Sequence, residues 1–288
     1  MTWALTKLKI FLEMIKFEHT VFALPYAYLG AFLAAGGVPK LRDFIFITLA
    51  MVGARTAAMS LNRIIDRQID ALNPRTKTRA LPQGLLKVSE VYFYTILSLA
   101  LFFWAASNLK PLALKLLPLA LFVLVIYSYT KRFTWASHLV LGLALSFAPL
   151  GSFVGISGVI PTAAYFLAAG VLFWVAGFDI IYALQDAEFD KKHGLYSIPA
   201  RFGKDKALKI ARFFHFLTII AFLIAGISFG LRYFYFGGLL IVSLLLIYEH
   251  WLVKPDDLTK INIAFNNVNM VISILMFTVT VLDLIVKY

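Results

Sequence analysis

Residues 62–79 read NRIIDRQIDALNPRTKTR and follow an apolar run long enough to cross a bilayer. That run carries a single charge, Arg55. Asn62, Asp66 and Asp70 are four residues apart, so on a helix they form one polar stripe. Their oxygens suit Mg²⁺, which commonly shares its coordination with substrate phosphates, and the basic residues that follow suit phosphate oxygens. Two interpretations follow: a metal–diphosphate site at a membrane surface, or a helix end among lipid headgroups before an ordinary basic loop.

Composition places the chain in a bilayer. Of its 288 residues 61% are hydrophobic and 15% charged, and its mean hydropathy is +0.84, as in a membrane protein rather than in two soluble domains. The formal net charge of +12 is explained by lysine and arginine on cytoplasmic loops, so we predict no nucleic-acid partner. Nothing in the sequence indicates an obligate protein partner. Cysteine is absent, which excludes disulfides and thiolate chemistry.

Nine apolar runs approach the length of about 20 residues that a bilayer requires. We therefore predict an all-α integral membrane protein, in which nine transmembrane helices form a single bundle around a central cavity. Residues 1–288 are expected to form one domain. The predicted spans are 20–38, 44–66, 88–107, 112–130, 137–157, 162–185, 207–230, 233–252 and 263–285.

The distribution of basic residues predicts the orientation of this bundle. With the N-terminus in the cytoplasm, most loop lysines and arginines fall on the cytoplasmic side. The other side receives only Lys40, Arg42, Lys110, Lys115, Arg232 and Lys287. Residues 1–18 alternate lysine with apolar residues and are expected to form an interfacial amphipathic helix. We thus expect a multi-pass protein of the cytoplasmic membrane, with the loops 67–87 and 187–206 in the cytoplasm over the active site.

A second acidic stretch ends the sixth predicted span. Asp179, Asp186 and Asp190 share a helical face by their spacing, and the loop after them is again basic. The interval from Asp66 to Asp186 equals that from Asp70 to Asp190, which indicates pseudo-duplicated halves with one carboxylate pair in each. Because a charge in a bilayer helix is costly, this repetition favours the metal–diphosphate interpretation. Two facing motifs offer a pair of Mg²⁺ ions to one diphosphate.

These residues resemble the UbiA superfamily of intramembrane prenyltransferases over nearly the whole chain. The resemblance rests on the nine spans, the two acidic motifs and the run Arg75-Thr76-x-x-Arg79; Ala80 departs from it, because many members have proline there. The chain is most similar to 4-hydroxybenzoate polyprenyltransferases and to related enzymes of menaquinone pathways. The resemblance implies Mg²⁺-dependent transfer of a polyprenyl group from polyprenyl diphosphate to a small aromatic acid in quinone biosynthesis. An allylic cation would form in a water-poor chamber within the lipid bilayer.

The resemblance also implies roles for individual residues. The metal ligands would be Asn62, Asp66, Asp70, Asp186 and Asp190. The diphosphate ligands would be Arg75, Arg79 and Lys131, with Lys192 and Arg201 as further candidates; membrane anchoring is the alternative for each. Tyr127 and Tyr182 would stabilise the cation with their rings, or else they pack as ordinary aromatic residues.

Two charged residues are predicted to lie deeper. Arg55 lies on the same helical face as Asn62, and a benzoate carboxylate would give it a bidentate partner; pairing with Asp179 or with backbone carbonyls is the alternative. Asp179 either orients or deprotonates the phenol of the acceptor, or it pairs with Arg55. His138, His215 and His250 have no second ligand at a useful spacing, so we predict no zinc or haem site and treat them as structural.

Two alternatives for the function stay open. The acceptor can instead be a dihydroxynaphthoate or another lipid-quinone precursor. A cation-coupled secondary transporter is the alternative from another class, since intramembrane carboxylates and a related repeat fit it too. Both acidic motifs are predicted at the cytoplasmic ends of their spans rather than at the midplane, and this favours the enzyme.

Overall fold

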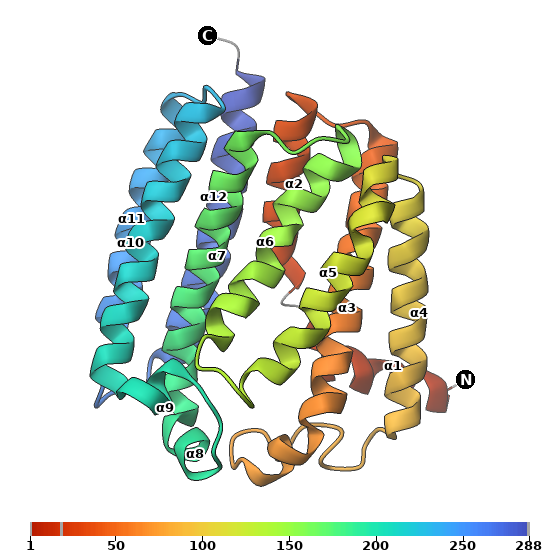
Figure 1. Ribbon diagram of the computed structural model, residues 1–288, viewed down its shortest axis with the longest axis vertical. Helices are drawn as coiled ribbons and strands as arrows, with labels where there is room; N and C mark the ends of the chain where they lie inside the picture. The colour runs from red at the N-terminus through yellow and green to blue at the C-terminus, as the bar shows by residue number, and fades with distance from the viewer. Residues whose placement is uncertain (1, 18–19, 287–288) are drawn as a thin grey trace.

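The chain folds into a bundle of long α-helices whose axes run along one direction (Figure 1). A computed structural model describes residues 2–17 and 20–286. Its helices are α1 Thr2–Met14, α2 Thr20–Ala35, α3 Leu41–Leu72, α4 Val88–Ser107, α5 Pro111–Thr130, α6 Ser137–Ile156, α7 Thr162–Ala183, α8 Ala187–Lys192, α9 Ile198–Phe202, α10 Lys204–Ser228, α11 Tyr233–Leu252 and α12 Asn269–Ile285. A 3-10 turn, Leu184–Asp186, joins α7 to α8, and a π-helix, Ile263–Val268, precedes α12.

The all-α membrane architecture predicted from the sequence is confirmed, although the count of nine spans is approximate. Within the described residues, 8 helices are long and apolar enough to cross a bilayer. The remaining predicted span, 20–38, is the shorter helix α2, which ends at Ala35. Gly36 follows with a φ of 63°, a left-handed conformation that terminates helices and that glycine adopts without strain. A multi-pass integral membrane protein follows from these helices.

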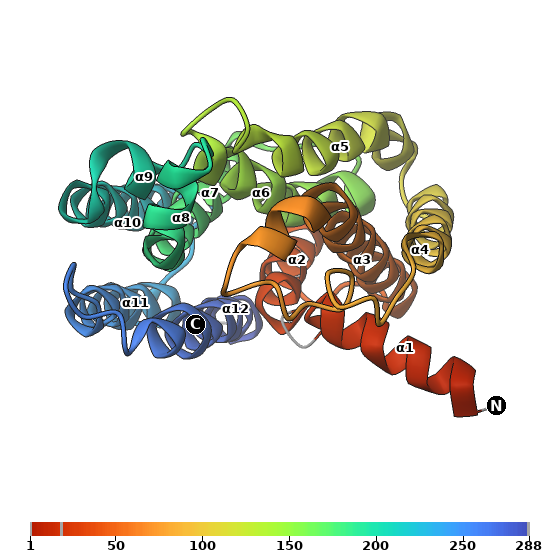
Figure 2. The same cartoon turned by 90° about the horizontal axis from the view of Figure 1, so that it is seen from below.

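α1 lies across the lower end of the bundle rather than along it (Figures 1 and 2). Phe11 and Ile15 are buried against the loop that joins α3 to α4, whereas Leu5 is exposed. Lys7 fixes this arrangement, because its Nζ donates to the Leu85 carbonyl over 2.8 Å. The helix is shorter than the one predicted for residues 1–18, because it ends at Met14, and Met1 and residue 18 are outside the described part. Its position at a membrane interface stays a prediction.

Close helix crossings bring α6 between α2 and α7. A Cβ added at Gly30 of α2 would lie 2.6 Å from the Pro149 carbonyl oxygen of α6, so this crossing requires glycine. Gly142 of α6 likewise faces the backbone of Leu172 in α7. Small residues at such crossings are the usual means of packing helices in a bilayer. They hold α6 close to α2 on one side and to α7 on the other, and residues of α6 and α7 line the cavity that forms the site.

A buried polar network ties the C-terminal helices to α7. Trp174 Nε1 donates to Asn269 Oδ1 over 2.7 Å, and Asn269 Nδ2 donates to Glu249 Oε1 over 2.9 Å. Nearby, His250 and His215 are hydrogen-bonded over 3.0 Å. Hydrogen bonds of this kind link transmembrane helices where water is absent, and here they connect α7, α10, α11 and α12.

Candidate active site

The two acidic motifs meet at the lower end of the bundle in Figure 1, where both α3 and α7 finish. Asn73, the residue after α3, joins them. Its Nδ2 donates to Asp186 Oδ1 over 2.9 Å, and its Oδ1 accepts the Arg75 amide over 2.9 Å. The connection between the motifs is therefore built into the chain at a buried asparagine.

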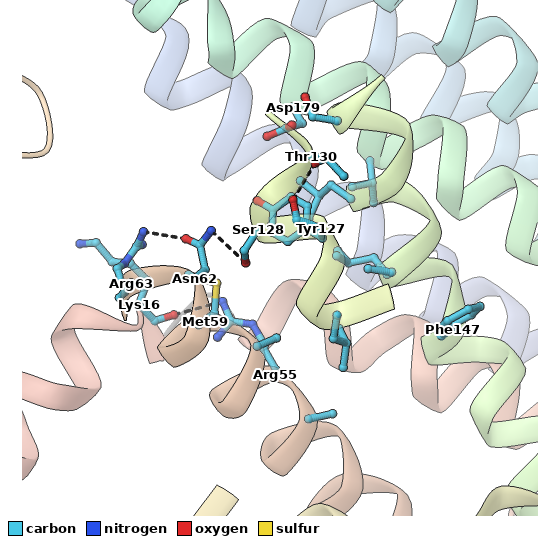
Figure 3. A pocket seen from close by; sticks show the side chains of 18 of the residues that line it. Lys16, Arg55, Met59, Asn62, Arg63, Tyr127, Ser128, Thr130, Phe147 and Asp179 are labelled. Atoms are coloured by element: carbon cyan, nitrogen blue, oxygen red, sulfur yellow. Dashed lines mark hydrogen bonds between the residues drawn. The ribbon is translucent and has the colours of Figure 1, made fainter. Parts of the chain in front are cut away.

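The first motif is one stripe on an uninterrupted helix, as its spacing predicts. Asp66 and Asp70 are buried, at 2% and 4% exposure. The Asn62 amide has a fixed orientation, because Nδ2 donates to Asp66 Oδ2 over 3.1 Å and to Ser128 Oγ over 3.3 Å, while Oδ1 accepts from Arg63 Nη1 over 3.2 Å (Figure 3). The three oxygen-bearing side chains are thus preorganised on one face.

Basic side chains neutralise both carboxylates of the first motif. Lys131 Nζ lies 2.8 Å from Asp66 Oδ2, and Arg132 Nη2 lies 2.9 Å from Asp66 Oδ1. Arg79 Nη1 lies 2.7 Å from each oxygen of Asp70. The predicted diphosphate ligands Arg79 and Lys131 are therefore brought to the predicted metal ligands, and Arg132 joins them.

The second motif is interrupted where the first is continuous. α7 ends at Ala183, the 3-10 turn Leu184–Asp186 follows, and α8 carries Asp190. A 3-10 turn has about three residues rather than 3.6 per turn, so it rotates the residues after it relative to Asp179. The expectation that three aspartates share one face of a single helix holds only in part for this reason.

Asp186 is held by Arg75, which belongs to the loop after the first motif. Arg75 Nε and Nη2 lie 2.9 and 2.5 Å from the two Asp186 oxygens, a bidentate geometry. Nη1 donates to the Tyr182 hydroxyl over 3.0 Å. Burial lowers the pKa of the Arg75 guanidinium, but the hydrogen bonds and charge of Asp186 outweigh it, so the pKa lies above its ordinary value. No described lysine or arginine forms an ion pair with Asp190.

A cavity of about 1310 Å³ extends from the two motifs along the bundle. Asp66 and Asp186 are part of its wall at the motif end, and Leu109 and Ile160 are part of it at the opposite ends of the helices. Most of the residues between these ends are aliphatic or aromatic. A molecule with an anionic head and a long apolar tail matches this distribution of charge.

Arg55 and Asp179 belong to the cavity wall, deeper than the motifs, on α3 and α7 (Figure 3). Arg55 Nη2 donates to the Lys16 carbonyl oxygen over 3.3 Å. Asp179 Oδ2 lies 2.7 Å from His138 Nδ1. The alternative ion pair between Arg55 and Asp179 is not among the ion pairs of the described residues, and the carboxylate contacts His138 instead.

The predicted aromatic residues also line the cavity. Tyr182 stacks on Phe265 with ring centroids 4.2 Å apart, and the Arg75 guanidinium lies 5.1 Å from the Tyr182 ring centroid. Tyr127, on α5, also lines the cavity. Both rings face space that a substrate would fill, and their contribution to cation stabilisation stays a prediction.

Lys192 and Arg201 are not brought to the site. Both are exposed, and neither lines the cavity. The loop that carries them lies at the motif end of the bundle, but these two side chains lie outside the cluster of ion pairs.

Four residues near the site were missed by the sequence reasoning: Arg63, Asn73, Arg132 and His138. Asn73 and Arg132 each have a sequence signal, since the first lies within the polar stretch and the second directly follows Lys131. His138 lies at the start of the predicted span 137–157, at the same end of the bundle as the acidic motifs. This position was the one sequence signal that His138 could lie near Asp179.

The donor set at the motif end fits a hard divalent cation. The candidate metal ligands of the two motifs are all carboxylate or amide oxygens, which Mg²⁺ prefers, and no sulfur ligand lies among them. In the described part of the chain no three acidic or histidine side chains converge closely enough to hold a metal by themselves. Asp66, Asp70 and Asp186 are instead paired with basic side chains, so a metal ion would have to exchange with those partners.

The fold and the cavity define an integral membrane protein with a long apolar cavity that carries its charged residues mainly at one end. The UbiA prenyltransferase family model matches residues 23–277, and the chain belongs to this family. It is therefore a prenyltransferase. It is 31% identical to a 4-hydroxybenzoate octaprenyltransferase of Francisella tularensis subsp. tularensis over 88% of each chain.

Solved structures of the same fold agree with this assignment. The apo structure of a UbiA homolog from Aeropyrum pernix K1 matches with a TM-score of 0.84 and 33% identity, over 92% of this chain and 98% of that one. A UbiA homolog from Archaeoglobus fulgidus bound to GPP and Mg²⁺ matches with a TM-score of 0.70 and 22% identity, over 96% of this chain and 100% of that one. The second likeness concerns the fold alone.

Proposed function

We propose that the protein transfers a polyprenyl group from polyprenyl diphosphate to 4-hydroxybenzoate or a similar aromatic acid, with Mg²⁺ as cofactor, in quinone biosynthesis. The observation that carries this proposal is the cluster of paired carboxylates and basic side chains at the mouth of one long apolar cavity. The names of the Francisella relatives support the acceptor, and the Archaeoglobus homolog bound to GPP and Mg²⁺ supports the prenyl diphosphate and the metal.

The motif end would bind the diphosphate through an exchange of partners. Asn62, Asp66, Asp70, Asp186 and Asp190 would hold the metal. The basic side chains that now neutralise the carboxylates, Arg75, Arg79, Lys131 and Arg132, are then available to the phosphate oxygens. When bound, Mg²⁺ supplies positive charge that stabilises the leaving diphosphate. The number of ions that we propose is two, one for each motif.

The cavity would bind the tail and shield the reacting carbon. Its apolar length accommodates the polyprenyl chain, and exclusion of water keeps an allylic cation from being captured as an alcohol. Tyr127 and Tyr182 line the wall near the motifs and would stabilise that cation with the negative faces of their rings. The Tyr182 hydroxyl is already bonded to Arg75, so its ring is held in place.

The acceptor would bind one level deeper. Asp179 lies seven residues before Asp186, about 10 Å along a helix at 1.5 Å per residue. Arg55 would bind the carboxylate of the acceptor, and Asp179 would accept the hydrogen of its phenol. Placed so, the ring carbon ortho to the hydroxyl faces the allylic carbon from below the diphosphate. We also infer that the motif end faces the cytoplasm, because most basic loop residues lie there.

Product formation tests the proposal directly. Purified protein in lipid would be incubated with geranylgeranyl diphosphate, Mg²⁺ and a panel of acceptors: 4-hydroxybenzoate, dihydroxynaphthoate and homogentisate. Mass spectrometry should find prenylated 4-hydroxybenzoate, EDTA should abolish its formation, and added Mg²⁺ should restore it. Prenylation of dihydroxynaphthoate alone would replace the acceptor, and full activity in EDTA would overturn the metal assignment.

A further inference from the structure

A histidine outside both acidic motifs holds Asp179. His138 is the second residue of α6, is 3% exposed and lines the cavity. Its Nδ1 lies 2.7 Å from Asp179 Oδ2, so the two side chains join α6 to α7 at the depth proposed for the acceptor. A buried polar pair within a bilayer is costly, which favours a function for it.

The contact of the second ring nitrogen, Nε2, shows which of the two His138 nitrogens carries the imidazole hydrogen. The amide nitrogen of Ile198, at the start of α9, lies 3.3 Å from His138 Nε2. A backbone N–H can only donate, so Nε2 accepts and Nδ1 carries the hydrogen that it donates to Asp179. Asp179 Oδ2 is thereby committed to the imidazole. The same side chain lines the cavity, where its other oxygen is available to a substrate.

The link to Ile198 also fastens the loop over the site. Two residues earlier, the Tyr196 amide donates to the Lys131 carbonyl oxygen over 2.7 Å. Lys131 itself pairs with Asp66. The loop 187–206 is therefore attached at two points. Tyr196 bonds the connection between α5 and α6 at Lys131, on the diphosphate side, and Ile198 bonds the start of α6 at His138, on the acceptor side.

We propose that His138 is a positioning residue for acceptor activation: it holds Asp179 in the orientation in which Oδ1 receives the phenolic hydrogen of the aromatic acid. This inference rests on the proposed function. His138 is not assigned as a base, because Nε2 accepts from the Ile198 amide and Nδ1 contacts Asp179. Its effect is to fix the carboxylate, as second partners of metal-bound and catalytic groups commonly do.

The reaction balances with this arrangement. The phenolic proton moves to Asp179, the ring carbon ortho to the oxygen bonds to the allylic carbon, and the allylic C–O bond breaks with its electron pair remaining on diphosphate. The resulting dienone loses its ring proton to the released diphosphate. Asp179 then returns the first proton to the oxygen. One ring hydrogen is replaced by the prenyl group, and one proton leaves with diphosphate.

Variants of His138 separate positioning from packing. His138→Asn keeps an N–H group near the position of Nδ1, whereas His138→Leu keeps bulk and removes the donor. His193→Gln is the matched control, because His193 is exposed and its Nδ1 hydrogen-bonds the Phe189 carbonyl oxygen, away from Asp179. Each variant would be assayed with 4-hydroxybenzoate, and binding of the prenyl diphosphate would be followed by thermal shift to show that the fold is intact.

We expect His138→Leu to lower kcat by about ten- to a hundredfold, with His138→Asn restoring most of it and the KM for prenyl diphosphate unchanged. The loss should shrink with 3-fluoro-4-hydroxybenzoate, whose phenol releases its proton more readily, and it should vanish on an Asp179→Asn background.

Normal kcat in His138→Leu would overturn the inference, as would an equal loss with and without Asp179. If His138→Leu does not fold, the kcat values of His138→Asn and His138→Gln are compared instead, each with 4-hydroxybenzoate and with its 3-fluoro analogue. Absence of product in the unaltered protein would instead overturn the proposed function itself.

Discussion

The two acidic motifs have the same residue types at the same end of the bundle, but their electrostatic surroundings differ. Asp66 and Asp70 face three basic side chains, from Lys131, Arg132 and Arg79. Asp186 has one basic partner, Arg75, which reaches it from the loop of the first motif, and Asp190 pairs with no described lysine or arginine. The two motifs are therefore similar in sequence but differ in the number of basic side chains that pair with them.

The difference assigns separate tasks to the two basic loops. Arg75 and Arg79 of loop 67–87 neutralise one carboxylate in each motif, so this loop serves both halves. Lys192 and Arg201 of loop 187–206 lie exposed outside the cavity. The second loop lines the cavity with Asp190, Tyr196 and Ser197 and donates the Ile198 amide to His138, but none of these groups is basic. A basic run after an acidic motif is therefore not by itself a phosphate site.

The largest expected effect comes from removing one carboxylate charge in each motif. Asp66→Asn and Asp190→Asn should each lower turnover by at least about a hundredfold, because each weakens the charge that holds the metal against the leaving group. Turnover with saturating substrates and Mg²⁺ measures this. Near-normal turnover in either variant would remove that residue from the ligand set.

Stability distinguishes the same two variants. Asp66→Asn leaves Lys131 and Arg132 without their shared carboxylate, so its melting temperature should fall. Asp190→Asn breaks no ion pair of the described residues and should melt as the unaltered protein does. A loss of stability in Asp190→Asn and none in Asp66→Asn would contradict the asymmetry.

The elements of the fold follow from the sequence because each is a local property. Apolar length predicts the spans, and the four-residue spacing of Asn62 and Asp66 predicts their common face. The α3 helix nevertheless runs to Leu72, beyond the predicted span 44–66, because the polar motif continues the helix past the apolar part. The end of α3 at Leu72 is therefore defined by its backbone hydrogen bonds and not by hydropathy.

The contacts between motifs do not follow from the sequence, because helix packing decides them. The pair between Arg75 and Asp186 joins residues 111 positions apart, and many arrangements of nine spans keep both on one side without bringing them together. The same holds for His138 and Asp179. Interpreting His138 as structural was reasonable from its spacing, since no second ligand lies near it in the sequence; its partner belongs to another helix.

The residues that lie deeper than the motifs give the next effect. At this depth α3 carries a basic residue, Arg55, and α7 carries an acidic residue, Asp179, so the two helices differ here as well. Arg55→Ala should raise the KM for 4-hydroxybenzoate about thirty- to a hundredfold, since a charge-assisted bidentate pair contributes roughly 2–3 kcal/mol. Prenyl diphosphate binding should stay nearly the same. Steady-state kinetics with each substrate varied in turn measures both.

Two acceptors serve as the control for Arg55. An analogue without the carboxylate should lose little further on Arg55→Ala, because the missing contact is the same. Equal weakening of both substrates would instead assign Arg55 to the diphosphate. A loss of folding without any effect on acceptor selectivity would assign it to the contact with the Lys16 carbonyl.

The smallest effect tests the two basic loops against each other. Arg75→Gln removes the bidentate partner of Asp186, and Arg201→Gln removes an exposed guanidinium of the same charge in the other loop. Arg75→Gln should raise the KM for prenyl diphosphate about tenfold, because hydrogen bonds to charged groups contribute roughly 1.5–3 kcal/mol and the phosphate would be partly held by the remaining cations. Arg201→Gln, alone or with Lys192→Gln, should change it by less than about threefold, since exposed charges interact weakly through solvent. Isothermal titration with a non-hydrolysable prenyl diphosphonate separates binding from turnover in both variants. If Arg201→Gln weakens binding as much as Arg75→Gln does, the second loop must close over the diphosphate during the reaction, and the two basic loops would be equivalent after all.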